Sequence, residues 1–80
     1  MDNIELTEVS RDRTFTTMMI EGLSVEEMNE VLRRKDDALG EVMQKHGMGN
    51  TFECWKCGYG IYGIRHFGGH LLVQIGNSCD

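Results

Sequence analysis

Two cysteines and two histidines in the second half of the sequence are the residues whose types and spacing best suit metal chemistry. Cys54 and Cys57 form a C-x-x-C pair, and His66 and His70 are separated by three residues. Structural zinc sites hold the ion with four thiolate or imidazole ligands in a tetrahedron. These four residues are therefore the candidate ligands of one structural zinc ion, but the interpretation that we favour is a chain without any cofactor.

The segment FECWKCG, residues 52–58, resembles the first knuckle of a zinc ribbon. The resemblance covers only these seven residues, because a second C-x-x-C pair is missing. Eight residues separate Cys57 from His66, fewer than the about twelve of a C2H2 zinc finger. His46 or Cys79 would replace a histidine that cannot reach the ion. In the favoured interpretation, the two cysteines are small buried packing residues at a strand-turn-strand corner.

The turn between two predicted strands, at about 59–66 and 70–76, decides whether both histidines can bind one ion. Gly-Gly is a favourable two-residue hairpin turn, and with Gly68-Gly69 as the turn, Phe67 pairs with His70. This register collects the apolar side chains on one face, whereas a three-residue loop divides them between two faces. We favour the two-residue turn, which places His66 and His70 on opposite faces.

Enzymatic chemistry has little support in the sequence. A thiol-based enzyme, with Cys54 or Cys57 as nucleophile and a histidine as base, is the remote alternative. Redox C-x-x-C pairs normally open a helix, and the GYG that follows this pair does not resemble one. No serine–histidine, paired-carboxylate or phosphate-loop pattern stands out. We therefore expect a protein that is not an enzyme.

An amphipathic helix is the best-defined element around these residues. Ser24 and Glu27 form a capping box at its start, and Gly47 suits the position after its end. Between them, one stripe of apolar residues recurs at helical spacing, which predicts a single helix from about 24 to 46. Gly40 is expected on its outer side, where it weakens the helix by about 1 kcal/mol relative to alanine.

Strands are predicted on both sides of this helix. Segments at about 3–9 and 14–20 are rich in Thr, Ile, Val and Phe and should form a hairpin. Three more strands follow, at about 51–56, 59–66 and 70–76. The expected fold is one α+β domain over residues 1–80: an N-terminal hairpin, one long helix and a three-stranded antiparallel meander. The helix packs on one face of the sheet.

Charge is distributed unevenly along the 80 residues, whose net charge is −5. The first 45 residues contain eleven acidic and six basic side chains. An acidic surface repels phosphates, so we expect no direct binding to nucleic acid and instead a protein partner with a basic surface. The three cysteines are an odd number, there is no basic leader, and no apolar run is long enough for a bilayer. We therefore expect a cytoplasmic protein that does not contact membranes.

The predicted partner-binding surface is acidic with aromatic anchors. Four acids lie opposite the apolar stripe of the helix, three more extend the surface from the first hairpin, and two aromatic residues of the neutral half are candidate hot spots. The four helix acids are Glu26, Glu30, Asp37 and Glu41, those of the hairpin are Glu5, Glu8 and Asp12, and the aromatic residues are Trp55 and Phe67.

These features favour a small acidic interaction protein that binds and blocks or modulates another protein. In size, charge and lack of catalytic motifs the chain is similar to small phage-encoded inhibitors, including anti-CRISPR proteins. That likeness implies a basic nucleic-acid-binding surface as the target and the cytoplasm of a host cell as the location. The alternative is a zinc-stabilised adaptor that binds through its C-x-x-C knuckle. A homodimer through an uncovered sheet face or edge is compatible with both.

Overall fold

A computed structural model describes residues 4–57 and 60–77, and in these ranges the chain forms four strands and three helices. The class is α+β, as predicted, and no helix in the described ranges combines the length and apolarity needed to cross a membrane. In chain order the elements are β1 (Glu5–Arg11), β2 (Phe15–Glu21), α1 (Val25–Arg34), α2 (Asp36–Lys45), α3 (Gly49–Lys56), β3 (Ile61–Phe67) and β4 (His70–Gly76).

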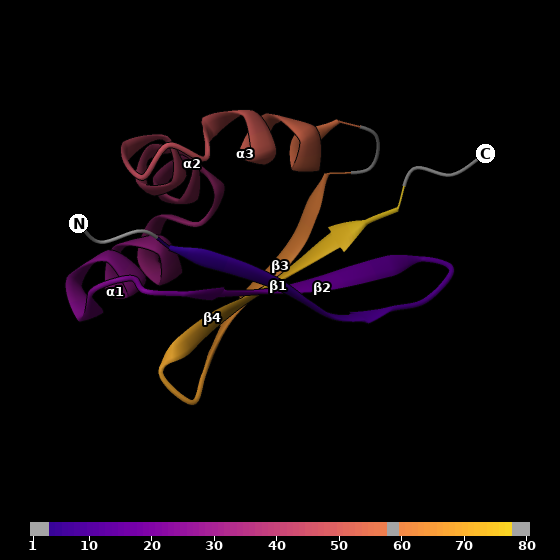
Figure 1. The fold of residues 1–80 in the computed structure, drawn as a ribbon, viewed down its shortest axis with the longest axis horizontal. Coiled ribbons are helices and arrows are strands. Elements are labelled where there is room, and N and C mark those ends of the chain that lie inside the picture. The colour runs from indigo at the N-terminus through magenta and orange to yellow at the C-terminus, as the bar shows by residue number, and fades with distance from the viewer. Residues whose placement is uncertain (1–3, 58–59, 78–80) are drawn as a thin grey trace.

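The strands form one antiparallel sheet in the order β1-β2-β4-β3. Two hairpins, β1–β2 and β3–β4, meet through β2 and β4, so the last strand lies between the first hairpin and β3 (Figure 1). The N-terminal hairpin was predicted, but the three-stranded meander is wrong. It required a strand at 51–56, and the described chain is helical there.

Both hairpin turns have local causes. In the first, Asp12 Oδ1 accepts hydrogen bonds from the backbone N–H groups of Thr14 and Phe15 at 2.8 and 2.7 Å, which makes an Asx turn. In the second, Gly68 and Gly69 have φ values of 57° and 87°, as a type I′ turn requires. Phe67 pairs with His70 across it, so the predicted two-residue turn and its register are confirmed.

The single helix predicted from 24 to 46 is wrong, because the chain breaks at Lys35. The φ and ψ angles of Lys35 are 63° and −131°, and this residue both ends α1 and begins α2. No apolar residue occurs from 33 to 37, so nothing holds a straight helix on the core there. The break turns α2 back so that its own apolar residues reach the core. The capping box of Ser24 and Glu27 is confirmed.

The segment predicted as a strand at 51–56 is most of α3. Its Thr, Phe, Cys and Trp favour strands locally, and tertiary packing overrides such a weak preference. Phe52 is buried, and Met48 and Trp55 pack against the same core. These three residues have the i, i+4, i+7 spacing of one helix face, so packing of that face selects the helix.

The core lies between the helices and one face of the sheet (Figure 1). Burying a large aliphatic side chain completely contributes about 1.5–3 kcal/mol relative to leaving it exposed. Residues on β2, β4, α1 and α2 supply this term. No helix in the described part of the chain covers the opposite face of the sheet (Figure 1). The largest fully buried side chains are Ile20, Val31, Leu39, Met43, Leu71 and Val73.

Candidate functional site

A groove of about 390 Å³ runs between α2 and α3. We call it the acidic groove, because four carboxylates and one lysine line it. Asp37 and Glu41, two of the predicted partner-binding residues, lie on its α2 wall. The full lining is Asp36, Asp37, Gly40, Glu41 and Gln44 from α2, and Gly49, Asn50, Phe52, Glu53 and Lys56 from α3.

The floor of the acidic groove is made where Gly40 faces Phe52. A Cβ atom at Gly40 would lie 2.7 Å from Phe52 Cε2, closer than such atoms approach. Gly40 therefore lets the two helices pack closely, and its predicted place on the outer side of the helix is wrong. The Phe52 ring is buried but lines the groove, and Lys56 Nζ lies 5.4 Å from its centroid, within cation–π distance.

The groove is negatively charged with few internal partners for its acids. Asp36, Asp37 and Glu53 are exposed, and no ion pair joins them to any other residue of the described ranges. Acids in the first turn of a helix stabilise it through the macrodipole, which accounts for Asp36 and Asp37 without a ligand. It does not account for Glu53, which lies on the facing wall.

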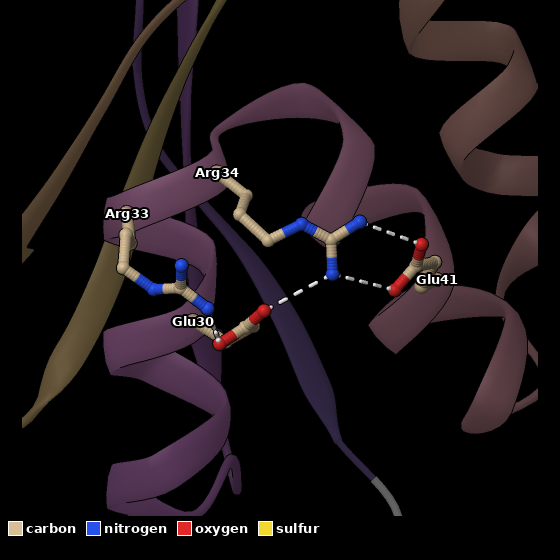
Figure 2. A network of polar contacts seen from close by, with 4 residues as sticks. All are labelled: Glu30, Arg33, Arg34 and Glu41. Atoms are coloured by element: carbon tan, nitrogen blue, oxygen red, sulfur yellow. Dashed lines mark hydrogen bonds and ion pairs between the residues drawn. The ribbon is translucent and has the colours of Figure 1, made fainter.

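Arg34 joins the two helices that the break at Lys35 separates (Figure 2). Its Nη1 atom lies 3.0 Å from Glu30 on α1, and its Nη2 atom lies 2.8 Å from Glu41 on α2. Arg33 adds an ion pair of 2.6 Å with Glu30. Hydrogen bonds from Arg34 lower the pKa of Glu41, and those from Arg33 and Arg34 lower the pKa of Glu30. Each exposed pair stabilises little, but the network neutralises two of the predicted acids and orients α1 against α2.

The remaining predicted acids do not join the groove. Glu26 is exposed in the first turn of α1. Glu5 and Glu8 lie on β1, where Glu8 pairs with Arg11 at 2.9 Å. The carboxylate of Asp12 holds the first hairpin turn, and the hydrogen bonds that it accepts from two backbone N–H groups lower its pKa. The predicted acidic residues are therefore spread over separate parts of the molecule.

The two predicted aromatic anchors also lie apart. Trp55 is half-buried against the core and lines a separate hollow of about 200 Å³ beside Cys54 and Cys57. Phe67 is 68% exposed at the end of β3, on the sheet face that has no helix. Neither residue contributes to the lining of the acidic groove.

Cys54 and Cys57 are exposed at the C-terminal end of α3. Their predicted place in a strand-turn-strand corner is therefore wrong, and they are not buried packing residues. Among the residues from 4 to 57 and from 60 to 77, no three His, Cys, Asp or Glu side chains gather where they could share a metal ion. Cys79, a predicted replacement ligand, lies outside the described residues, and the zinc site stays a prediction.

The three histidines lie in different surroundings. His66 pairs with Leu71, and His70 pairs with Phe67, so the two side chains point to opposite faces of the hairpin, as the register predicted. His46 Nε2 lies 3.0 Å from Glu27 Oε2, and Lys45 Nζ is also 3.0 Å from that oxygen. His46, the other replacement ligand, thus takes part in a contact between α1 and the end of α2.

Glu27 is the most strongly perturbed carboxyl of the described residues. Burial alone would raise its pKa, but hydrogen bonds from the Ser24 backbone, His46 and Lys45 outweigh burial and lower it to about 2. Only 14% of its side chain is exposed. Because Glu27 is held by partners from two helices, its role is structural.

The α3 side of the acidic groove was missed by the sequence analysis, because a strand was predicted there. The helical spacing of Met48, Phe52 and Trp55 is the signal that could have revealed it. Glu53 and Asn50 then follow as neighbours on the exposed side of that helix.

In comparisons with known proteins, no family model matches this chain, and no curated protein or solved structure is significantly similar to it.

Proposed function

We propose that the chain is a non-enzymatic binding protein that docks the acidic groove on a basic surface of a partner protein and so blocks or modulates that partner. The observation that supports this proposal is the arrangement of the groove walls. Carboxylates from α2 and α3 face one space, and three of them, Asp36, Asp37 and Glu53, make no ion pair within the described ranges.

The lining suits a lysine or arginine side chain of the partner. Its charged end would meet the carboxylates at the rim, and the amides of Gln44 and Asn50 offer further hydrogen bonds. Its aliphatic part would lie along the floor formed by Gly40 and Phe52. Complementary charge mainly raises the association rate and the specificity, so binding should weaken as salt is added.

The basic surface in this proposal is one that normally holds nucleic acid. Such surfaces are built to bind closely spaced negative charges, and the acidic groove offers charges of the same sign on a chain whose net charge is −5. The chain would then compete with nucleic acid in the cytoplasm of a host cell, as a phage-type inhibitor of the anti-CRISPR kind does.

Displacement of nucleic acid tests this function. The chain is titrated into a panel of purified proteins with basic clefts, CRISPR effectors included, each carrying its own fluorescent oligonucleotide. Fluorescence anisotropy reports displacement. We expect saturable displacement from a panel member, and Asp37→Lys or Glu53→Lys should each weaken it about tenfold, because a repulsive charge replaces an attractive one.

Glu26→Lys is the matched control. Glu26 and Asp37 are both exposed acids in the first turn of a helix, so both reversals disturb the helix dipole alike, but only Asp37 lines the groove. If Glu26→Lys weakened displacement as much as Asp37→Lys, the groove would not be the docking site. Absence of displacement from every member would refute competition with nucleic acid.

A further inference from the structure

The sheet face that no helix of residues 4–57 and 60–77 covers is a second exposed surface, which we call the open face (Figure 1). On β2, Thr16 and Ile20 are buried on the helix side, so the alternating residues Phe15, Thr17 and Met19 lie on the open face. The cross-strand pairs place further residues of the other strands on this same face. They include Glu5 and Thr7 on β1, Leu72 and Gln74 on β4, and Arg65 and Phe67 on β3.

The open face is apolar at its centre. Met19 and Leu72 are direct neighbours on the two middle strands, and both are only half-buried. Phe15 and Tyr62 meet edge to face with ring centroids 5.0 Å apart, and Tyr62 remains 58% exposed. Aromatic residues, methionine and arginine are enriched at protein interfaces, so the composition of this face suits protein contact.

Charges of opposite sign lie at the two edges of the open face. Glu5 is on β1, and Arg65 is on β3, at the opposite edge of the sheet. Three strand spacings of about 4.8 Å separate these edges, roughly 14 Å in all, which is too far for an ion pair within one chain. The face therefore has a carboxylate at one edge, a guanidinium at the other edge and mainly apolar side chains between them, with Glu21 and His70 3.7 Å apart at one end of the two middle strands.

We propose that the open face is the interface of a homodimer with a two-fold axis that runs along the strands, between β2 and β4. This axis lays β2 on β4 of the second copy and β1 on β3 of the second copy. Met19 then contacts Leu72 of the second copy. Arg65 lies over Thr7 of the second copy and within reach of its Glu5. Each contact occurs twice, as in any isologous interface.

Charge complementarity selects a second copy over other occupants. A nucleic acid would meet Glu5 and Glu21 on this face, which repel phosphates. A uniformly basic partner would meet Arg65. A second copy in the stated orientation instead matches each edge with an edge of opposite charge. The acidic grooves lie on the other side of the sheet, so the dimer would carry two of them outward and could bind a repeated partner with avidity.

A charge swap tests the dimer. Arg65→Glu and Glu5→Arg should each raise the dimer Kd about ten- to a hundredfold, because each reversal is repeated by symmetry. The double variant, with both changes, should return the Kd to within about threefold of the unchanged chain. Sedimentation equilibrium gives the Kd values, and circular dichroism verifies that each variant is folded.

Further variants separate this interface from other causes of association. Met19→Glu should leave only monomers, whereas Val25→Glu, at a 67% exposed position on α1, should dimerise normally. Asp37→Lys should also dimerise normally, so the groove and the dimer can fail independently. A chain that is monomeric at every concentration, or a double variant that does not recover, would overturn the proposed interface.

Discussion

Replacing Gly40 by alanine should destabilise the protein, although helix propensity alone predicts the opposite. In an open helix position the change stabilises by about 1 kcal/mol. Here the new methyl group would lie 2.7 Å from Phe52 Cε2 and 3.1 Å from Cζ. Phe52 is buried, so its ring cannot swing into solvent, and α2 and α3 must move apart.

The net effect follows from two opposing terms. Overpacking a buried contact costs about 1–3 kcal/mol, against the gain of about 1 kcal/mol in helix propensity. We expect a net loss of about 1 kcal/mol. For a domain of this size that lowers the Tm by about 4–8 °C.

Chemical and thermal denaturation of Gly40→Ala, with Gly49→Ala as the matched control, measure this effect. Gly49 is also helical, but its added Cβ would meet only Gln44 at 3.6 Å, an ordinary contact, so stability should hold or rise. The double variant Gly40→Ala/Phe52→Leu should show a positive coupling, because removing the ring edge relieves the clash. A Gly40→Ala chain as stable as the unchanged chain, with additive double-variant energies, would refute the packing explanation.

Three further outcomes are expected. The depressed pKa of Glu27 contributes up to about 3 kcal/mol of stability that is present above pH 4.5 and lost as pH falls toward 2. Glu27→Gln should remove this part of the pH dependence of stability in urea titrations, and an unchanged pH dependence would contradict the prediction. Lys35→Gly should stabilise the fold by about 1 kcal/mol, because glycine adopts φ 63° and ψ −131° without strain. A lower Tm for this variant would contradict the prediction. The double variant Cys54→Ser/Cys57→Ser should change stability by under about 0.5 kcal/mol, since both side chains are exposed. A measured content of one zinc per untagged chain, with a Tm that falls on chelation, would instead favour the zinc-stabilised adaptor.

Features with local causes could be predicted from the sequence. The capping box needs only Ser24 and Glu27 at the right spacing, and the register of the last hairpin follows from Gly68-Gly69 and the alternation of its strands. The acidic character of the chain and two groove residues, Asp37 and Glu41, were also found this way. These features depend on residues a few positions apart, so the sequence contains the needed information.

The break at Lys35, the helical state of α3 and the acidic groove were decided by tertiary packing. The apolar residues before position 33 and after position 37 stay in phase on one helical wheel, which is compatible with one continuous helix, so only the burial of α2 on the core reveals the break. Phe52 and Trp55 favour a strand locally, and the helix forms because it buries them beside Met48. The groove then exists because Gly40 meets Phe52 across two helices. A contact between separate elements depends on their arrangement in space, which local spacing and propensity do not contain.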